Sequence, residues 1–197
     1  MAIKHSSMFP IKKDNTHYKK LTNSFVSEEK FKSQKMLVIE NEGLKHIAEN
    51  AFFDVSHLYR TSHLKQLKLI LDDREASKND KFVALTMLKN ANISCAGVLP
   101  MCQDTGTAII NGYKGQNVFT GFDDGEFLSE GVLECYKKNN LRYSQLAPIS
   151  MFEEKNTGNN LPAEINLYSS QGSEYKFAFI QKGGGSANKS FLYQKTK

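Results

Sequence analysis

Apolar residues recur at steps of three and four over residues 44–90, and this is the period of an α-helix. The first run consists of Leu44, Ile47, Ala48, Ala51, Phe52, Val55 and Leu58. A second helix is expected to begin with Ser62 as its N-cap, and the polar run 72–80 separates it from a third helix that ends near Asn90. Three amphipathic helices in succession predict a packed helical layer over about residues 40–92.

The pattern changes after residue 95. Thr107–Ile110 and Asn117–Thr120 have the composition of short strands, and Asn111-Gly112 between them is a typical hairpin turn. Residues 125–139 return to a helical period, and the preceding Asp123-Asp124 predicts where this helix begins.

Apolar and polar residues then alternate in residues 165–167 and 175–179, with the turn sequence Gln171-Gly172-Ser173 between them. This pattern predicts a β-hairpin. Helices followed by strands, without βαβ alternation, indicate an α+β fold. We therefore expect a helical layer followed by a largely antiparallel sheet with one more helix.

The chain divides into two parts. Residues 1–35 are polar and weakly patterned, which predicts an extended N-terminal arm, and a short strand is expected at Met36–Ile39. The other 162 residues (36–197) are enough for a single domain. No stretch approaches the roughly 20 apolar residues that a membrane-spanning helix needs.

The formal net charge of +5 raises the question of nucleic-acid binding. The lysines are scattered along the chain among acidic residues, and the arginines are Arg60, Arg74 and Arg142. Nucleic-acid surfaces usually cluster Lys and Arg. A lysine-rich, solvated surface is the better interpretation, and no nucleic-acid or membrane partner is expected.

The three cysteines, Cys95, Cys102 and Cys135, are odd in number and irregularly spaced, so a disulfide framework is not expected. Polar and charged residues interrupt every apolar core of a secretory signal before Phe52. A reducing intracellular compartment, cytoplasmic or mitochondrial, follows as the expectation.

Residues 99–106 place a thiol, Cys102, beside the polar groups of Gln103, Asp104 and Thr105 on one short turn. Such a turn could hold a metal ligand next to groups that bind a polar substrate. A buried, inert cysteine is the commoner alternative. A metal site would also need further ligands, because the sequence has neither a Cys-x-x-Cys pair nor a His cluster near Cys102.

Residues 182–189 read Lys-Gly-Gly-Gly-Ser-Ala-Asn-Lys. Successive glycine N–H groups at a strand end can surround an anion, although the spacing does not match a Walker A loop. A flexible turn after a hairpin explains the glycines equally well.

Arg142 lies in the polar and aromatic segment 139–145 and is the only arginine in the second half of the chain. Arginine binds a carboxylate through two parallel hydrogen bonds, although a surface salt bridge is the commoner role of a single arginine. Residues 153–163, rich in turn formers, predict an ordered loop and by themselves no more.

Four segments taken together resemble class I fumarase, the iron–sulfur-dependent fumarate hydratase family. They are Pro-Met-Cys-Gln-Asp-Thr-Gly-Thr-Ala at 100–108, Asn-Leu-Arg-Tyr-Ser-Gln at 140–145, Asn-Thr-Gly-Asn-Asn-Leu-Pro-Ala at 156–163, and the glycine segment at 182–189. The resemblance covers about residues 8–197. The Ser-Ala-Asn-Lys continuation of the last segment is similar to single-chain fumarases, whereas the two-subunit tartrate dehydratase branch tends to continue Ser-Glu-Asn.

The resemblance implies a hydro-lyase that interconverts (S)-malate and fumarate at a four-iron, four-sulfur (4Fe-4S) cluster held by three cysteine thiolates. It assigns Cys102 as one cluster ligand and Asp104 as a catalytic proton donor or acceptor. It assigns substrate contacts to Gln103, Asp104, Arg142 and the backbone of Gly185. Lys182, Ser186 and Lys189 are weaker candidates that would support the glycine loop.

The family pattern also implies what residues 36–197 lack. This region matches an N-terminal catalytic domain that is truncated at its C-terminal side, and two further cluster cysteines are expected beyond residue 197. The 197-residue chain alone is therefore expected to be inactive, and the full-length protein to form a homodimer. Two alternatives stay open: a dehydratase of tartrate or another hydroxy-dicarboxylate, and a non-catalytic module that binds an anion.

Overall fold

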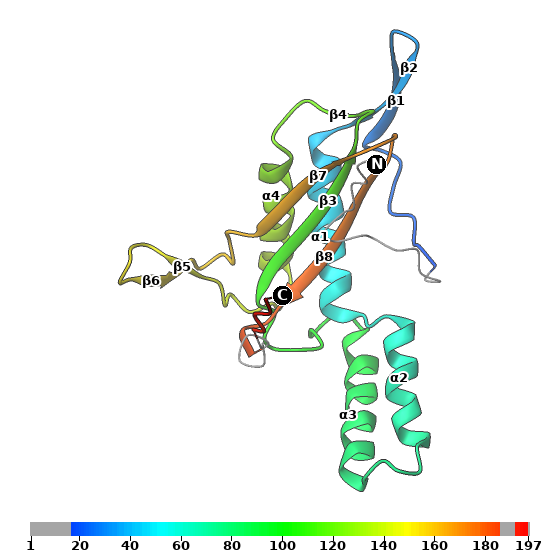
Figure 1. The fold of residues 1–197 in the computed structure, drawn as a ribbon, viewed down its shortest axis with the longest axis vertical. Coiled ribbons are helices and arrows are strands. Elements are labelled where there is room, and N and C mark those ends of the chain that lie inside the picture. The colour runs from blue at the N-terminus through cyan, green and yellow to red at the C-terminus, as the bar shows by residue number, and fades with distance from the viewer. Residues whose placement is uncertain (1–16, 186–191, 197) are drawn as a thin grey trace.

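A computed structural model describes residues 17–185 and 192–196 of the chain (Figure 1). The helices are α1 (Asn41–His57), α2 (Thr61–Asp72), α3 (Lys78–Ser94) and α4 (Asp124–Lys138). The strands are β1 (Val26–Phe31), β2 (Gln34–Ile39), β3 (Thr107–Gly115), β4 (Val118–Thr120), β5 (Leu146–Pro148), β6 (Glu154–Asn156), β7 (Glu164–Ser170) and β8 (Tyr175–Lys182). This mixture confirms the α+β class, and most of the strand pairings are antiparallel.

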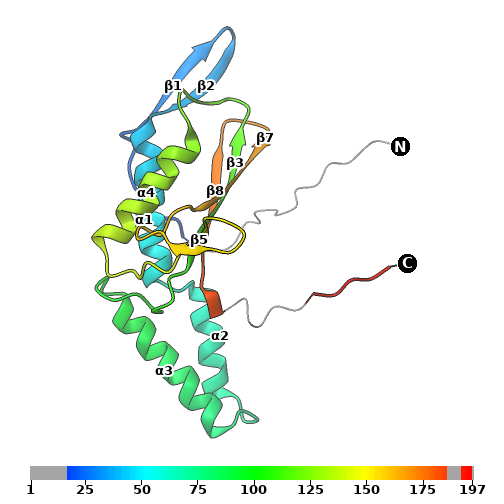
Figure 2. The same cartoon turned by 90° about the vertical axis from the view of Figure 1, so that its left-hand side faces the viewer.

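The body of the molecule has two layers. Strands β7, β3 and β8 form a sheet, and α1 and α4 pack together on one of its faces (Figure 2). The core between the layers consists chiefly of Leu44, Ala48 and Phe52 from α1, Leu128, Val132, Cys135 and Tyr136 from α4, and Ala108 and Ile110 from β3. Fully burying a side chain such as Leu128 contributes about 2 kcal/mol.

The helices α1 and α4 approach closely at Gly131. A Cβ atom there would lie 2.3 Å from the carbonyl oxygen of Lys45 in α1. Only glycine allows this contact between the two backbones. The helical layer therefore differs from the predicted one in which helices form it. α1 packs against α4, from much later in the chain, while α2 and α3 pack against each other.

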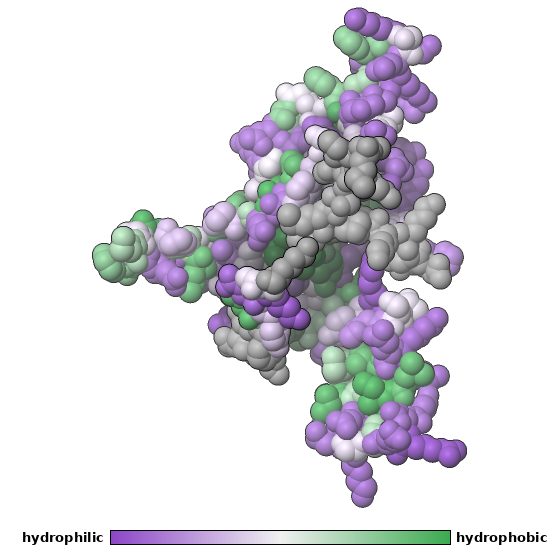
Figure 3. Space-filling model, in the orientation of Figure 1, coloured by the Kyte–Doolittle hydropathy of each residue, from purple (hydrophilic) through white to green (hydrophobic). Residues whose placement is uncertain are grey.

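The α2–α3 pair projects away from the sheet, as Figure 1 shows at its lower right. Its inner contacts bury Leu67 and Ala84, whereas Leu69 and Phe82 remain 66% and 67% exposed. Figure 3 shows the resulting apolar surface on this part of the molecule. Two helices packed only against each other cannot bury all their apolar residues. Some apolar positions of the helical pattern therefore stay exposed in this pair.

The ends of these helices correct one prediction. Ser62 is not an N-cap, because α2 begins one residue earlier and Arg60 occupies the cap position without a side-chain cap bond. Ser77 is the residue that caps: its hydroxyl accepts the N–H of Asp80, whose carboxylate accepts the N–H of Ser77. This reciprocal capping box fixes where α3 begins.

The predicted turn at Asn111-Gly112 is also wrong, because β3 continues through it from Thr107 to Gly115. Side chains of the neighbouring strands pack over Gly112, where a Cβ atom would lie 2.6 Å from Leu167 Cδ2. Glycine is thus required by close packing in the middle of the sheet rather than by a turn. The chain turns after Gly115, and β4 pairs in parallel with β2 instead of with β3.

Strands β7 and β8 lie where alternation predicted strands, but they do not form a hairpin. Strand β3 lies between them, parallel to β7 and antiparallel to β8. The connection 171–174 crosses the end of β3, where the Gly115 N–H donates to the Glu174 carbonyl at 2.9 Å. A Cβ atom on Gly115 would lie 2.4 Å from the Gly172 carbonyl oxygen, so the crossing depends on glycine.

The region predicted as an N-terminal arm contains part of a hairpin. Residues 26–31 form β1, antiparallel to β2, and β2 contains the predicted strand Met36–Ile39.

A buried carboxylate joins β4, the neighbour of β2, to the core: Asp124 in α4 accepts from Lys114 Nζ of β3 and from Tyr175 OH of β8, each at 2.8 Å. Thr120 of β4 also donates to Asp124. None of the helices in residues 17–185 is long and apolar enough to cross a membrane.

Candidate active site

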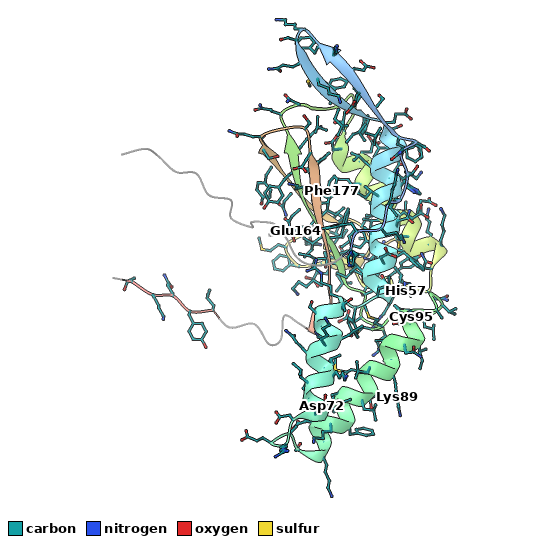
Figure 4. The ribbon with its side chains drawn as sticks, turned by 90° about the vertical axis from the view of Figure 1, so that its right-hand side faces the viewer. His57, Asp72, Lys89, Cys95, Glu164 and Phe177 are labelled. Carbon is teal, nitrogen blue, oxygen red and sulfur yellow. The ribbon has the colours of Figure 1, made fainter. Side chains whose placement is uncertain are left out.

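The loop that carries Cys102 begins where α1 and α3 end. The N–H of Met101 donates to the carbonyl of Ser56 at 2.9 Å, and Asn90 Nδ2 donates to the carbonyl of Met101 at 2.7 Å. Ser94 Oγ also donates to the carbonyl of His57, which Figure 4 labels at the end of α1. These bonds fix the backbone just before Cys102, whose own side chain is exposed.

Gly106 brings this loop against the end of β8. Its φ is +55°, and a Cβ atom would lie 2.0 Å from the Lys182 carbonyl oxygen. Both the backbone conformation and the close approach require glycine. The sequence Asp-Thr-Gly therefore crosses directly over the glycine loop that follows β8.

Asp104 contacts that glycine loop through its carboxylate. The N–H of Gly185 donates to Asp104 Oδ2 at 3.3 Å, and a Cβ atom on Gly183 would lie 2.6 Å from the same oxygen. The glycines thus leave room for a carboxylate beside their backbone. Lys182 Nζ lies 3.5 Å from the carbonyl of Gly183, whereas Ser186 and Lys189 lie outside the described residues.

Arg142 is held beside the same loop by its backbone. Thr105 Oγ1 donates to the Arg142 carbonyl at 3.0 Å and accepts from the Arg142 N–H at 3.1 Å. Thr107 Oγ1 donates to Gln145 Oε1 at 2.8 Å. The backbone around Arg142 is therefore fixed, while its side chain is exposed to solvent together with those of Cys102 and Gln103.

Two buried residues lie beneath these loops, and neither is a candidate site residue from the sequence alone. Asn160 bonds to the backbone of Gly106, Ser144 and Gln145, and so connects the third motif to the first two. Tyr136 donates its hydroxyl proton to the carbonyls of Thr105 and Gly106, at 3.0 and 3.2 Å. Asn160 lies within the motif 156–163, whereas the sequence around Tyr136 indicates only one more apolar position of a helix.

Burial raises the pKa of Tyr136 to about 12, so its hydroxyl keeps its proton at neutral pH. Gln181 Nε2 donates to this hydroxyl at 3.3 Å and to Ser56 Oγ at 2.8 Å. Since the Ser56 carbonyl accepts from Met101, one buried polar network supports both ends of the loop 101–106.

The cysteines differ in what they can bind. In the part of the chain that the structure describes, no three His, Cys, Asp or Glu residues are grouped to hold a metal ion. Cys135 is buried in the core, and burial raises its pKa to about 12, which suits packing and not ligation. Cys95 is exposed and donates to the Asn92 carbonyl at the end of α3. Cys102 is thus an accessible thiol beside the candidate substrate-binding groups, and its position suits one ligand of a larger metal site.

Residues 45–197 match the family model described as Fumarate hydratase (Fumerase). The chain belongs to the class I fumarate hydratase family. It is 54% identical over 193 residues to the anaerobic class I fumarate hydratase of Escherichia coli K12, covering 98% of this chain and 35% of that protein. It is 56% identical over 184 residues to the mitochondrial fumarate hydratase 1 of Leishmania major, covering 92% of this chain and 34% of the relative.

The chain therefore spans about a third of the length of these class I fumarate hydratases, and it corresponds to their N-terminal part. Fumarate hydratase 2 of Leishmania major is 48% identical over 184 residues, covering 92% of this chain and 32% of that protein. The structure brings together the loops that carry the residues that the family resemblance selects: Cys102, Gln103, Asp104, Arg142 and Gly185.

Proposed function

We propose that this chain is the N-terminal catalytic part of a lyase that interconverts (S)-malate with fumarate and water. One observation supports this proposal most strongly. Four segments separated by up to about 80 residues converge through hydrogen bonds on the backbone around Asp104 and Arg142. A cation together with hydrogen-bond donors suits the binding of a dicarboxylate, and the Arg142 guanidinium and the Gly185 N–H would provide them.

Arg142 would bind one substrate carboxylate through its guanidinium group, because its planar fork matches a carboxylate. Its backbone is fixed by Thr105, so only the side chain has to be ordered when substrate binds. Gln103 would bind another substrate oxygen. The N–H of Gly185, which donates to Asp104 Oδ2 in the structure, would turn to a substrate oxygen when the substrate binds. A preorganised site of this kind lowers the entropic cost of orienting the substrate.

Asp104 would move the proton. In dehydration, malate loses a proton from the carbon beside one carboxylate and a hydroxyl from the adjacent carbon, and the products are fumarate and water. The Asp104 carboxylate would accept that proton and return it during hydration. In the structure the Gly185 N–H donates to Asp104 Oδ2, and transfer of this N–H to the substrate would free the carboxylate to accept the proton.

The proposed cofactor is a 4Fe-4S cluster. Cys102 would provide one thiolate, and the other two cysteines would come from the part of the full-length protein that this chain does not include. When bound, the cluster would supply a Lewis acid that polarises the substrate hydroxyl as a leaving group. The exposed position of Cys102 is compatible with this role.

The proposal is tested by anaerobic iron–sulfide reconstitution of the full-length protein and, separately, of the 197-residue chain. We expect the full-length protein to dehydrate malate and to absorb in the visible range. We expect neither from the shorter chain, because one thiolate cannot hold the cluster. A stable cluster with turnover in the 197-residue chain would contradict this account.

A related hydroxy-dicarboxylate such as tartrate is the alternative substrate. The names of the similar proteins favour malate and fumarate. Comparing kcat/KM for malate and tartrate with the full-length protein decides between them. Light scattering on the same protein tests the proposed homodimer, and fractionation of the source cells tests a cytoplasmic or mitochondrial location.

A further inference from the structure

Asn160 combines complete burial with an unusual backbone conformation. Its exposed fraction is 0%, and its φ is +60°, which lies in the left-handed region. Asparagine adopts this conformation more readily than most residues, although glycine adopts it more easily still. A buried polar amide at such a position needs hydrogen-bond partners, because an unpaired one loses its bonds to water without compensation.

The Asn160 side chain finds these partners in two other loops. Its Oδ1 accepts the N–H groups of Ser144 and Gln145, both at 3.0 Å, and its Nδ2 donates to the Gly106 carbonyl at 2.9 Å. Ser144 follows Arg142 by two residues, and Gly106 follows Asp104 by two residues. One amide thus connects the loop of the proposed carboxylate clamp with the loop of the proposed proton carrier.

We propose that Asn160 is a positioning residue that sets where Arg142 lies relative to Asp104. This inference rests on the proposed function, since it concerns how the two residues bind one dicarboxylate together. Thr105 provides a second link to Arg142, but it is attached to the same loop as Gly106. Without Asn160, the N–H groups of Ser144 and Gln145 would lose their buried acceptor. Among the bonds to other segments that the structure describes, the segment 143–145 would then keep only those that Asn156, Thr157 and Thr107 donate to Tyr143 and Gln145.

Substitution by glycine separates the side chain from the backbone turn. Asn160→Gly keeps a residue that tolerates φ near +60° and removes all three hydrogen bonds. Asn160→Asp keeps the acceptor for Ser144 and Gln145 but places an oxygen against the Gly106 carbonyl. Asn159→Ala is the matched control, because Asn159 Oδ1 accepts only from the nearby Leu161 N–H among the bonds that the structure describes.

The first readout is amide hydrogen exchange in the 197-residue chain, and it does not depend on activity. We expect Asn160→Gly to accelerate exchange at Ser144 and Gln145 at least tenfold, while Ile110 in the centre of β3 stays protected. Asn160→Asp and Asn159→Ala should keep both amides protected. Unchanged exchange at Ser144 and Gln145 in a folded Asn160→Gly chain would overturn the inference. If that chain did not fold, loss of protection at both amides in folded Asn160→Asp would overturn it.

The second readout is steady-state kinetics of the full-length protein. Asn160→Gly should raise KM for malate at least about tenfold, whereas iron per polypeptide stays at the parent level. A purely structural role would lower kcat in proportion to the folded fraction and leave KM unchanged, and this result would overturn the inference. Lack of malate turnover in the parent protein would instead refute the proposed function, and the exchange experiment would still decide whether Asn160 holds the loops.

Discussion

At the scale of single residues, the loops of the site depend on glycines in a backbone conformation that other residues adopt only with strain. Gly106 and Gly158 both have positive φ, +55° and +69°. Their surroundings differ, because a Cβ atom on Gly106 would collide with Lys182, whereas nothing lies within 4 Å of one on Gly158. The pair therefore separates the cost of the backbone conformation from the cost of the collision.

We predict that Gly158→Ala lowers the free energy of unfolding by about 1–2 kcal/mol, which is the cost of a left-handed residue with a Cβ atom. Gly106→Ala should lower it by at least about 3 kcal/mol, because β8 must also move away. Urea unfolding of the two variants measures both values. Equal losses would show that the contact between Gly106 and Lys182 is looser than described.

The cysteines provide a second test at this scale. Since burial raises the pKa of Cys135 to about 12, only about one thiol in ten thousand would be ionised at pH 8. We predict that iodoacetamide modifies Cys95 and Cys102 in the folded chain and all three cysteines in urea. Mass spectrometry counts the additions, and modification of Cys135 in the folded chain would contradict its assignment to the core.

Residue identity alone revealed some of the site and not the rest. Cys102, Asp104 and Arg142 attract attention because thiols, carboxylates and guanidinium groups carry chemistry wherever they lie. Tyr136 and Thr105 act through distant backbone carbonyls, and such partners are not encoded in the neighbouring sequence. A buried polar network of this kind becomes visible only when the fold brings its members together.

At the scale of elements, the helices followed from the sequence and the strand pairing did not. Helical periodicity is local, so α1 and α4 could be predicted to within a few residues. Strand alternation located β7 and β8, but their separation by β3 depends on contacts over more than 50 residues. For the same reason, the sequence Asn111-Gly112 predicts a turn, although Gly112 lies within β3 and leaves room for the Leu167 side chain.

The helix caps give a prediction for these elements. Ser77→Ala should destabilise α3 by about 1 kcal/mol, because it removes the acceptor for the Asp80 N–H. Ser62→Ala should be neutral or slightly stabilising, since Ser62 lies inside α2 and alanine favours a helix. Hydrogen exchange in α2 and α3 measures both effects, and a comparable loss for Ser62→Ala would restore Ser62 as a cap.

At the scale of the whole molecule, the candidate site lies at one end of the sheet and at its boundary with the α2–α3 pair. α1 and α4 cover one face of the sheet, and no helix in the described part covers the other (Figure 2). The chain also spans only about a third of its relatives' length. Under the proposed function, these loops would form one wall of a larger site, to which Cys102 would contribute a ligand of the cofactor.

The most direct measurement is the iron content and malate dehydration rate of the full-length protein after anaerobic reconstitution, compared with Cys102→Ala and with Cys95→Ala as the exposed-cysteine control. The account predicts that Cys102→Ala loses both the cluster and turnover, because one of three thiolates is gone. Cys95→Ala should retain both. Parent levels of iron and turnover in Cys102→Ala would contradict the central claim that Cys102 is a cluster ligand.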